Sequence, residues 1–171
     1  MKKFALLLIM CIAGLFTAHA QKFALVDMDY IMENIPSYQQ ANNELNQLSQ
    51  QFQQEVEAKI KEAETLYKAY QKNAATMSST QKTQKEEAIV AKEKEAAELR
   101  KKYFGPEGEM VKKQEALISP IQDKIYEAIK QISLQKGYDV VVDRASASSV
   151  VFASPRIDIS NEVLSKLGYS N

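Results

Sequence analysis

The sequence between Ser37 and Lys136 contains one cluster of glycines, at Gly105 to Gly108, and otherwise consists mainly of residues that favour helix. Segments with β-strand composition occur only near the two ends of the chain. At 1.5 Å per residue, a helix from Ser37 to Ala75 would be roughly 60 Å long, more than a small globule can bury. The sequence therefore predicts an arm that projects from a small folded end. We expect the function to lie in what such arms enclose or reach.

Apolar residues in the outgoing helix recur at alternating spacings of three and four, the pattern of a coiled-coil seam. After Phe52 two successive steps of four lead through Val56 to Ile60, and alternation returns at Ala63. Such an extra step is a stutter, which locally unwinds the supercoil. The seam positions are Tyr38, Ala41, Leu45, Leu48, Phe52, Val56, Ile60, Ala63, Tyr67, Tyr70, Ala74 and Met77.

A reversal is predicted near residues 77–82, where small hydroxyl residues replace helix formers. Ser78 and Gln81 fit a capping box, in which each side chain bonds the other residue's backbone N–H. The pattern that follows, from Ile89 to Tyr103, is laced with charges of both signs, as in a solvated helix that returns along the first one. We therefore expect an antiparallel helical hairpin over residues 37–117 with its tip near 77–82.

The tip of this hairpin is basic. No Asp or Glu lies between Glu64 and Glu86, whereas Lys68, Lys72, Lys82 and Lys85 all do. These lysines form either a solvated turn or a functional patch. The apolar residues nearby also allow two interpretations, since they either pack in the seam or stay exposed for contact with another molecule. These residues are Tyr67, Tyr70 and Met77.

The return helix is interrupted where Pro106 lies between Gly105 and Gly108, because proline between two glycines breaks or sharply kinks a helix. A tip near Ser79 places Pro106 opposite Phe52, where the stutter begins. The sequence thus predicts a hinge at Gly105, Pro106 and Gly108. A static kink is the alternative.

Three short segments have strand composition: Phe23–Val26, Tyr138–Val142 and Val150–Ala153. With residues 21–36 and 118–171 as the body, the fold class is α+β, mainly α. Three strands and a few apolar helical turns make too small a core for about 150 mature residues, so we expect homo-oligomerisation to complete it. The body residues expected to hold the oligomer are Phe23, Leu25, Val140, Val142, Val151 and Phe152.

Residues 1–20 have the composition of a secretory signal peptide. Lys2 and Lys3 precede an apolar run from Phe4 to Phe16, and Ala18-His19-Ala20 fits an A-x-A cleavage site. The apolar run is shorter than the roughly 20 residues that span a bilayer. We expect cleavage after Ala20 and a mature chain in an exported compartment.

Cleavage would remove the only Cys and the only His, and the chain has no Trp. Disulfides, thiol catalysis, His-based acid/base chemistry and His/Cys metal sites are then excluded. We expect no enzymatic activity, no metal and no cofactor. The remaining acidic residues of interest are interpreted as turn and capping residues: Asp27, Asp29, Asp143 and Asp158.

The charge balance argues against nucleic acid as a partner. The chain has 22 basic and 22 acidic residues, and loss of Lys2 and Lys3 leaves 20 basic residues and a formal charge of −2. A protein without a basic surplus has no global attraction to a polyanion.

Three segments carry a resemblance: Phe23–Asp29 (FALVDMD), Lys136–Asp143 (KGYDVVVD) and Asp158–Leu164 (DISNEVL). Together with the long hairpin, they resemble the OmpH/Skp family of periplasmic chaperones. The resemblance implies a trimer whose strands assemble into a joint β body, with three arms around a cavity that holds unfolded outer-membrane proteins without ATP. This chain lacks the strongly basic character of the best-known members, and its surplus of positive charge is confined to the arm tips.

The expected function is that of an ATP-independent periplasmic holdase that binds unfolded outer-membrane β-barrel proteins and prevents their aggregation. Contact of the basic tips with a membrane surface is also expected. The alternative is a structural coiled-coil spacer or adaptor in the cell envelope. The residues expected to contact clients are Tyr67, Lys68, Tyr70, Lys72, Met77, Lys82 and Lys85.

Overall fold

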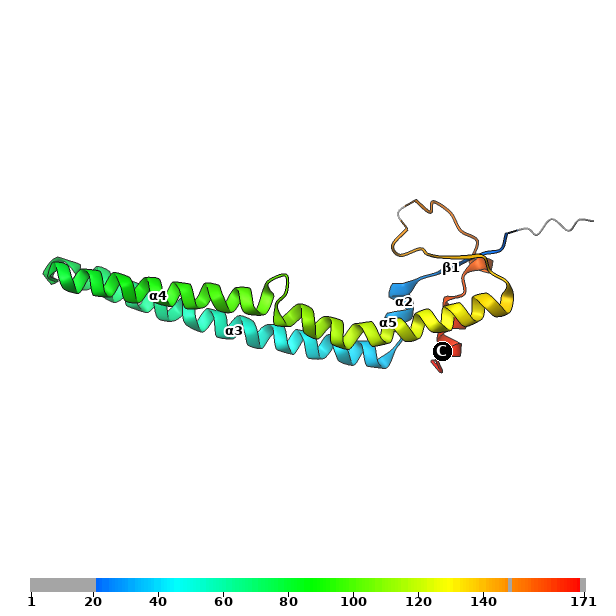
Figure 1. Ribbon diagram of the computed structural model, residues 1–171, viewed down its shortest axis with the longest axis horizontal. Coiled ribbons are helices and arrows are strands. Elements are labelled where there is room, and N and C mark those ends of the chain that lie inside the picture. Colours follow the sequence, from blue (N-terminus) through cyan, green and yellow to red (C-terminus); the bar gives the residue numbers. More distant parts are fainter. Residues whose placement is uncertain (1–20, 148, 170–171) are drawn as a thin grey trace, which may run out of the picture.

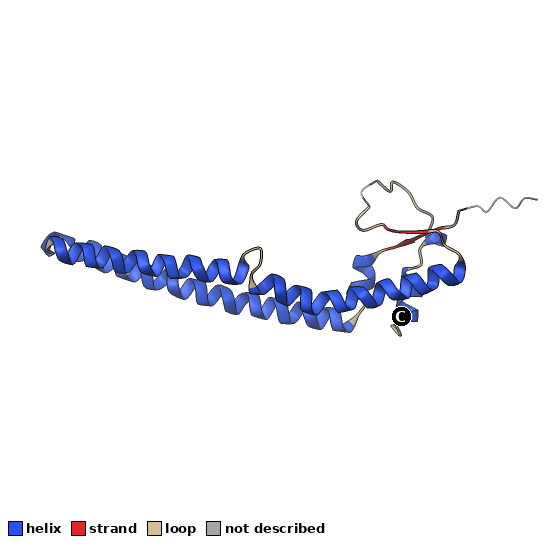
Figure 2. Cartoon of the chain, viewed as in Figure 1, coloured by secondary structure: helices blue, strands red, loops and turns tan. Residues whose placement is uncertain are grey.

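The computed structural model describes residues 21–147 and 149–169, and the predicted signal peptide lies outside this range. A long helical hairpin leaves a small body at one end of the molecule (Figure 1). Strands occur only in that body (Figure 2). The predicted fold class, mainly helical α+β with a long antiparallel hairpin, is confirmed. The elements are β1 (Phe23–Val26), α2 (Met28–Glu33), α3 (Pro36–Asn73), η1 (Ala74–Thr76), α4 (Ser79–Phe104), α5 (Glu109–Lys136), β2 (Val140–Asp143), η2 (Pro155–Ile157) and α6 (Ser160–Lys166).

The outgoing helix α3 has 38 residues and begins at Pro36, one residue before the predicted start. Proline suits this position because its missing N–H would have no intrahelical partner there. The return helix α4 begins with the predicted capping box. The Ser78 hydroxyl accepts from the Gln81 backbone N–H at 3.3 Å, and the Gln81 side chain accepts from the Ser78 N–H at 2.9 Å. The start of the return helix at the tip is thus stabilised by hydrogen bonds between residues only three apart in the sequence.

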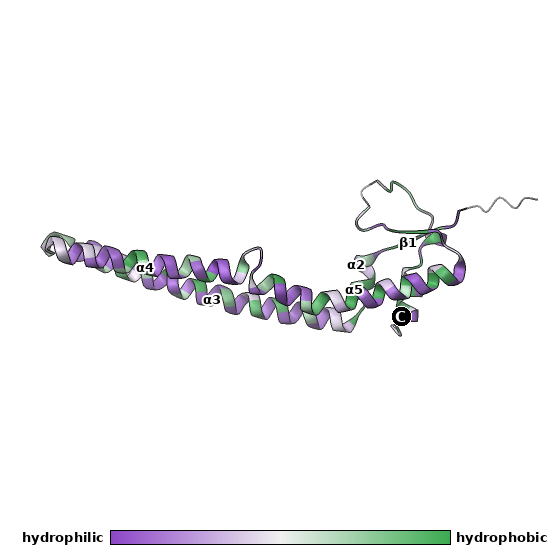
Figure 3. Ribbon diagram, in the orientation of Figure 1, coloured by the Kyte–Doolittle hydropathy of each residue, from purple (hydrophilic) through white to green (hydrophobic). Residues whose placement is uncertain are grey.

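The two arm helices pack antiparallel along most of the predicted seam. Ile60 and Tyr67, which were predicted as seam positions, are exposed instead. Figure 3 shows that apolar residues form scattered patches along the arm, whereas they gather in the body. The outer half of the arm therefore depends on a narrow apolar contact. The buried arm residues are Ala41, Phe52, Val56 and Ala63 on α3 and Ile89, Ala96 and Tyr103 on α4.

The body packs around the C-terminal half of α5, from Ile121 to Ile132. Strands β1 and β2 pair in parallel, with Phe23 opposite Val140 and Val26 opposite Asp143. The chain between the two strands forms the whole arm, which leaves the body and returns before β2 begins.

The most deeply buried side chains of the body are Ile31, Ile125 and Val163, from α2, α5 and α6. The core comprises Ala24, Val26, Ile31, Ile35, Ile121, Ile125, Ala128, Ile132, Ile159, Val163 and Leu164.

The second strand begins at Val140, two residues later than predicted. Gly137 ends α5 in the left-handed region, with φ of 69°, and the Tyr138 N–H bonds back to the Ser133 carbonyl at 3.0 Å. Tyr138 thus belongs to the helix cap, which delays the strand.

The prediction of a third strand over Val150–Ala153 is wrong for this chain: these residues are irregular. One edge of β1 pairs with β2, and on the other Leu25 forms an isolated bridge to Asp158. A segment with strand composition forms a strand only when its backbone N–H and C=O groups pair with a neighbouring backbone. Among the described residues, no strand pairs with this segment. Val151 and Phe152 are instead 99% and 86% exposed.

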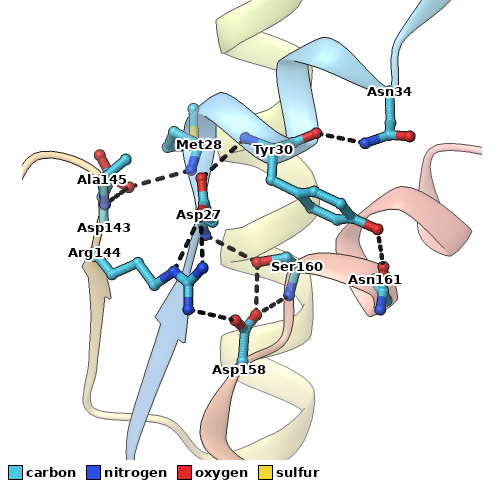
Figure 4. A network of polar contacts seen from close by, with 10 residues as sticks. All are labelled: Asp27, Met28, Tyr30, Asn34, Asp143, Arg144, Ala145, Asp158, Ser160 and Asn161. Carbon is cyan, nitrogen blue, oxygen red and sulfur yellow. Dashed lines mark hydrogen bonds and ion pairs between the residues drawn. The ribbon is translucent and has the colours of Figure 1, made fainter. Parts of the chain in front are cut away.

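Polar contacts secure both ends of the loop that carries Val151 and Phe152 (Figure 4). The Arg144 guanidinium donates to Asp27 at 3.0 Å and lies 3.9 Å from the Asp158 carboxylate. Asp158 in turn accepts from the Ser160 N–H at 2.9 Å. Asp27 caps α2 by accepting from the Tyr30 N–H. Asp27 thus caps α2 as predicted, whereas Asp158 is a turn residue before α6, whose N-cap is Ile159.

Asp29 lies in the first turn of α2, and Asp143, another of the predicted turn residues, accepts backbone hydrogen bonds. Its side chain accepts from the backbone N–H groups of Met28 and Ala145, at 3.2 Å and 3.0 Å. Although burial opposes ionisation, the bonds from Ser146, Met28 and Ala145 lower the pKa of Asp143 below its ordinary value.

Candidate functional site

A groove of about 650 Å³ runs between α3 and α4 on one side of the arm. Three large apolar side chains contribute to it while remaining open to solvent: Ile60 is 37% exposed, Tyr67 50% and Phe104 39%. An exposed apolar surface on a projecting arm suits contact with another molecule. The groove is lined by Val56, Ile60, Ala63, Glu64, Tyr67, Glu93, Ala96, Ala97, Arg100, Lys101, Phe104 and Gly105.

The stutter and three small residues explain why the groove forms here. Each residue advances a helix by about 100°, so two steps of four turn Ile60 away from the seam line of Phe52. Because Ala63, Ala96 and Ala97 are small, they leave the space between the helices unfilled. An apolar hollow results beside an intact seam.

The opposite side of the arm is closed by four charged side chains that form a ring across the helices. Lys92 lies 3.1 Å from Glu62 and 2.9 Å from Glu95, and Lys59 lies 3.5 Å from each of these glutamates. Hydrogen bonds from Lys92 lower the pKa of both glutamates. Partly exposed pairs of this kind add little stability, but they favour one helix register over others.

An aromatic cluster holds the two helices together at the inner end of the groove. The rings of Phe52 and Tyr103 stack with centroids 3.9 Å apart, and Phe104 meets Phe52 edge-on at 6.3 Å. The Tyr103 hydroxyl donates to the Glu55 carboxylate. Leu48, Leu99 and Met110 pack around the buried members of the cluster. Among the described residues, Phe52, Val56 and Tyr103 form the buried hydrophobic cluster of the arm.

The hydrogen bond between Tyr103 and Glu55 shifts both groups. It raises the pKa of Tyr103 to about 12 and lowers the pKa of Glu55. A lowered carboxyl pKa contributes stability that is present above the unfolded value of 4.5 and lost as pH falls. A raised tyrosine pKa contributes stability that is present below 10.0 and lost as pH rises through about 12.

We therefore expect Tyr103→Phe to lower the melting temperature by about 3 °C at pH 7, since it removes the bond but keeps the stacked ring. The difference between the two proteins should shrink below pH 4.5 and again above pH 10. Circular dichroism melts across this range provide the measurement. A difference that does not vary with pH would contradict the assigned role of the bond.

The break predicted from the sequence lies between α4 and α5 and is the short loop visible between their labels in Figure 1. Close backbone approach accounts for both glycines. A Cβ on Gly105 would lie 2.3 Å from the Lys101 carbonyl oxygen, and one on Gly108 would lie 2.7 Å from that of Tyr103. α3 is helical without interruption opposite this loop. A hinge at Gly105, Pro106 and Gly108 stays a prediction, and its motion would have to bend α3.

The residues predicted to contact clients differ in their exposure and in their contacts. Tyr67 is exposed in the groove, whereas Tyr70 is half-buried and donates to Glu86, and Met77 is half-buried at the tip. Within the described part of the chain, none of the four tip lysines has a carboxylate within 4.0 Å: Lys68, Lys72, Lys82 and Lys85. Their contact with clients or a membrane stays a prediction.

Sequence reasoning missed most of the groove. Only Tyr67 among its lining residues was predicted as a contact. The stutter was the available signal, since it ends at Ile60. No such signal marked Phe104 and Arg100, because the side of the arm to which their side chains point depends on how α4 is rotated against α3.

The predicted oligomer-holding residues of the body are not equivalent. Phe23, Val140, Val151 and Phe152 are exposed and Val142 is half-buried, but Leu25 is buried within its own chain. Leu25 therefore offers little surface to a partner. Among residues 21–147 and 149–169, no helix is both long and apolar enough to cross a bilayer, and no acidic, His or Cys side chains gather as a metal site.

Comparison with known proteins relates this architecture to one family. Residues 22–167 match the family model described as outer membrane protein (OmpH-like). Chaperone protein Skp of Yersinia enterocolitica is 25% identical over 158 residues, which cover 92% of this chain and 93% of that protein. Skp of Photorhabdus laumondii is 25% identical over 148 residues, 86% of each chain.

The fold is also shared with a solved structure. The crystal structure of an OmpH-like protein from Caulobacter crescentus CB15 superposes with a TM-score of 0.67. The superposition covers 86% of this chain and 83% of the other, at 16% identity. With a family model that spans nearly all of the described residues and the same hairpin on a small body, this chain belongs to the OmpH family.

Proposed function

We propose that this chain is an ATP-independent holdase chaperone of the periplasm. It binds unfolded outer-membrane β-barrel proteins in a cavity between the arms of a trimer and prevents their aggregation. Family membership supports the chaperone class, since the relatives compared above are named Skp chaperones. The predicted signal peptide supports the compartment.

The observation that carries the proposal is the apolar groove of the arm. Ile60, Tyr67 and Phe104 line this groove and stay partly exposed. A contiguous exposed apolar surface of this kind supports a binding role. Many weak contacts of this kind hold a client until its own fold in the membrane becomes more stable.

The body supports a trimer. A two-stranded sheet is marginal by itself, and β2 has no second neighbour among the described residues. The loop that follows β2 is anchored at both ends by contacts of Arg144 with Asp27 and Asp158. In the middle of this loop Val151 and Phe152 are exposed. Partner subunits would cover these side chains and extend the sheet.

The proposal is tested by diluting a denatured outer-membrane β-barrel protein with and without this chain, at three chains per client, and following light scattering. We expect the wild type to suppress most of the scattering. Ile60→Ser with Tyr67→Ser should weaken client affinity about tenfold, because it removes two apolar contacts.

A matched control uses Val90→Ser, which removes an exposed apolar side chain from α4 outside the groove. This variant should suppress scattering as well as the wild type does. Undiminished aggregation with the wild type would contradict the holdase function. That result would favour the alternative of a spacer or adaptor, which the unbroken α3 would also serve.

A further inference from the structure

The charged residues that line the groove are sorted by sign along its length. Glu64 and Glu93 lie toward the tip, whereas Arg100 and Lys101 lie toward the body. All four are exposed, and within the described residues none has an oppositely charged side chain within 4.0 Å. The ring of Lys59, Glu62, Lys92 and Glu95 on the other side of the arm shows a different arrangement, since there every charge is paired. The groove therefore has an acidic end and a basic end with free charges.

The length of the groove limits what it can hold. On α3 its lining runs from Val56 to Tyr67, which at 1.5 Å per residue corresponds to about 16 Å. An extended peptide advances about 3.3 Å per residue, so about five residues fit along the groove. The charged ends lie closer together, because Glu93 and Arg100 are seven residues apart on α4, about 10 Å, and the long flanking side chains of a peptide reach back to them. The floor between those ends is apolar, formed by Ala63, Ala96 and Ile60.

We propose that this groove binds one extended apolar segment of about five residues whose flanking charges are opposite, with the positive flank toward the arm tip and the negative flank toward the body. The inference rests on the proposed function, which supplies unfolded polypeptide as the ligand. Alternate side chains of an extended segment point to one face, so about three of the five contact the floor. The two flanking charged side chains then point toward the rim, where the four charged residues of the groove are exposed. The apolar contact supplies affinity, while the exposed charges select the orientation.

The test uses three blocked, fluorescent seven-residue peptides with the same five apolar residues, alternating Val and Ala around a central Leu. One peptide carries Lys at one end and Glu at the other, the second carries Lys at both ends, and the third carries Glu at both. We expect wild-type protein to bind the Lys/Glu peptide about fivefold more tightly than either of the others, since each mismatched end loses one exposed ion pair. This preference should disappear in 0.5 M salt.

Charge-reversal variants provide the matched controls, because all four side chains are exposed and unpaired among the described residues. Glu64→Lys with Glu93→Lys should prefer the peptide with two Glu ends. Arg100→Glu with Lys101→Glu should prefer the peptide with two Lys ends. The variant with all four changes should again bind the Lys/Glu peptide like the wild type, but in the opposite orientation.

Orientation is read from a spin label on Thr80→Cys at the tip. In the wild type it should broaden the NMR signals of the Lys end of the peptide, and in the fourfold variant those of the Glu end. Equal affinities of all peptides for all variants, or the same orientation in both proteins, would overturn the inference. If the wild type suppresses barrel-protein aggregation but shows no charge preference, the polarity of the groove is wrong and the holdase function stands. If the preference is found but aggregation is unchanged, the holdase function fails instead.

Discussion

Phe52→Ala is expected to lower the free energy of unfolding of the arm by about 3 kcal/mol, the largest effect we expect from a single arm substitution. Phe52 is buried, stacks on Tyr103 at 3.9 Å and contacts Phe104. Truncation removes the aromatic contact and leaves a cavity that the two helices cannot fill, since α3 is continuous and α4 is capped at both ends.

The effect is measured by urea denaturation followed by circular dichroism at 222 nm. Phe104→Ala is the matched control, because it removes the same side chain from a partly exposed position in the same cluster. We expect it to cost about 1 kcal/mol. Equal losses in the two variants would mean that the stacked pair is not the main attachment between the arm helices at this level.

Val151→Ser with Phe152→Ser is expected to convert the proposed trimer to a monomer at micromolar concentration. Fully burying a valine or phenylalanine contributes about 1.5–3 kcal/mol each, so the pair would contribute about 4 kcal/mol per subunit to assembly. The change should leave the fold of a single chain intact, since these side chains are 99% and 86% exposed in it.

Light scattering after size exclusion reports the mass. Val90→Ser, which changes an exposed apolar residue on the arm, should remain a trimer. A trimer that survives the double substitution would move the interface away from this loop. A wild-type monomer at micromolar concentration would contradict the shared body altogether.

Most of the arm could be predicted from the sequence because its signals are local. The spacing of apolar residues, the Ser78–Gln81 capping box and the glycines around Pro106 each act within a few residues. The predicted reversal near 77–82 also agrees with the contact of Phe52 with Tyr103, which lies three residues before Pro106.

The prediction of a third strand was wrong because amino-acid composition does not show which backbone segments become neighbours. Val150–Ala153 has the residues of a strand, but a strand also needs a neighbouring backbone. Both edges of β1 are occupied, by β2 and by the bridge to Asp158, and this segment does not pair with the free edge of β2. Which segments become neighbours depends on how the chain returns from the arm. The same limit applies to Leu25, whose burial within its own chain could not be read from strand alternation.

By itself, the sequence determined the antiparallel hairpin, its capped tip, the position of its break and the small mixed body at its base. These features follow from periodicity and from residues that begin or end helices. Only the tertiary structure decided which side of the arm is open. The apolar groove with its acidic and basic ends and the closed ring of Lys59, Glu62, Lys92 and Glu95 arise from the rotation of α3 against α4. That rotation is set by packing between residues far apart in the chain, such as Ile60 at the end of the stutter and the small Ala96, which line the same groove.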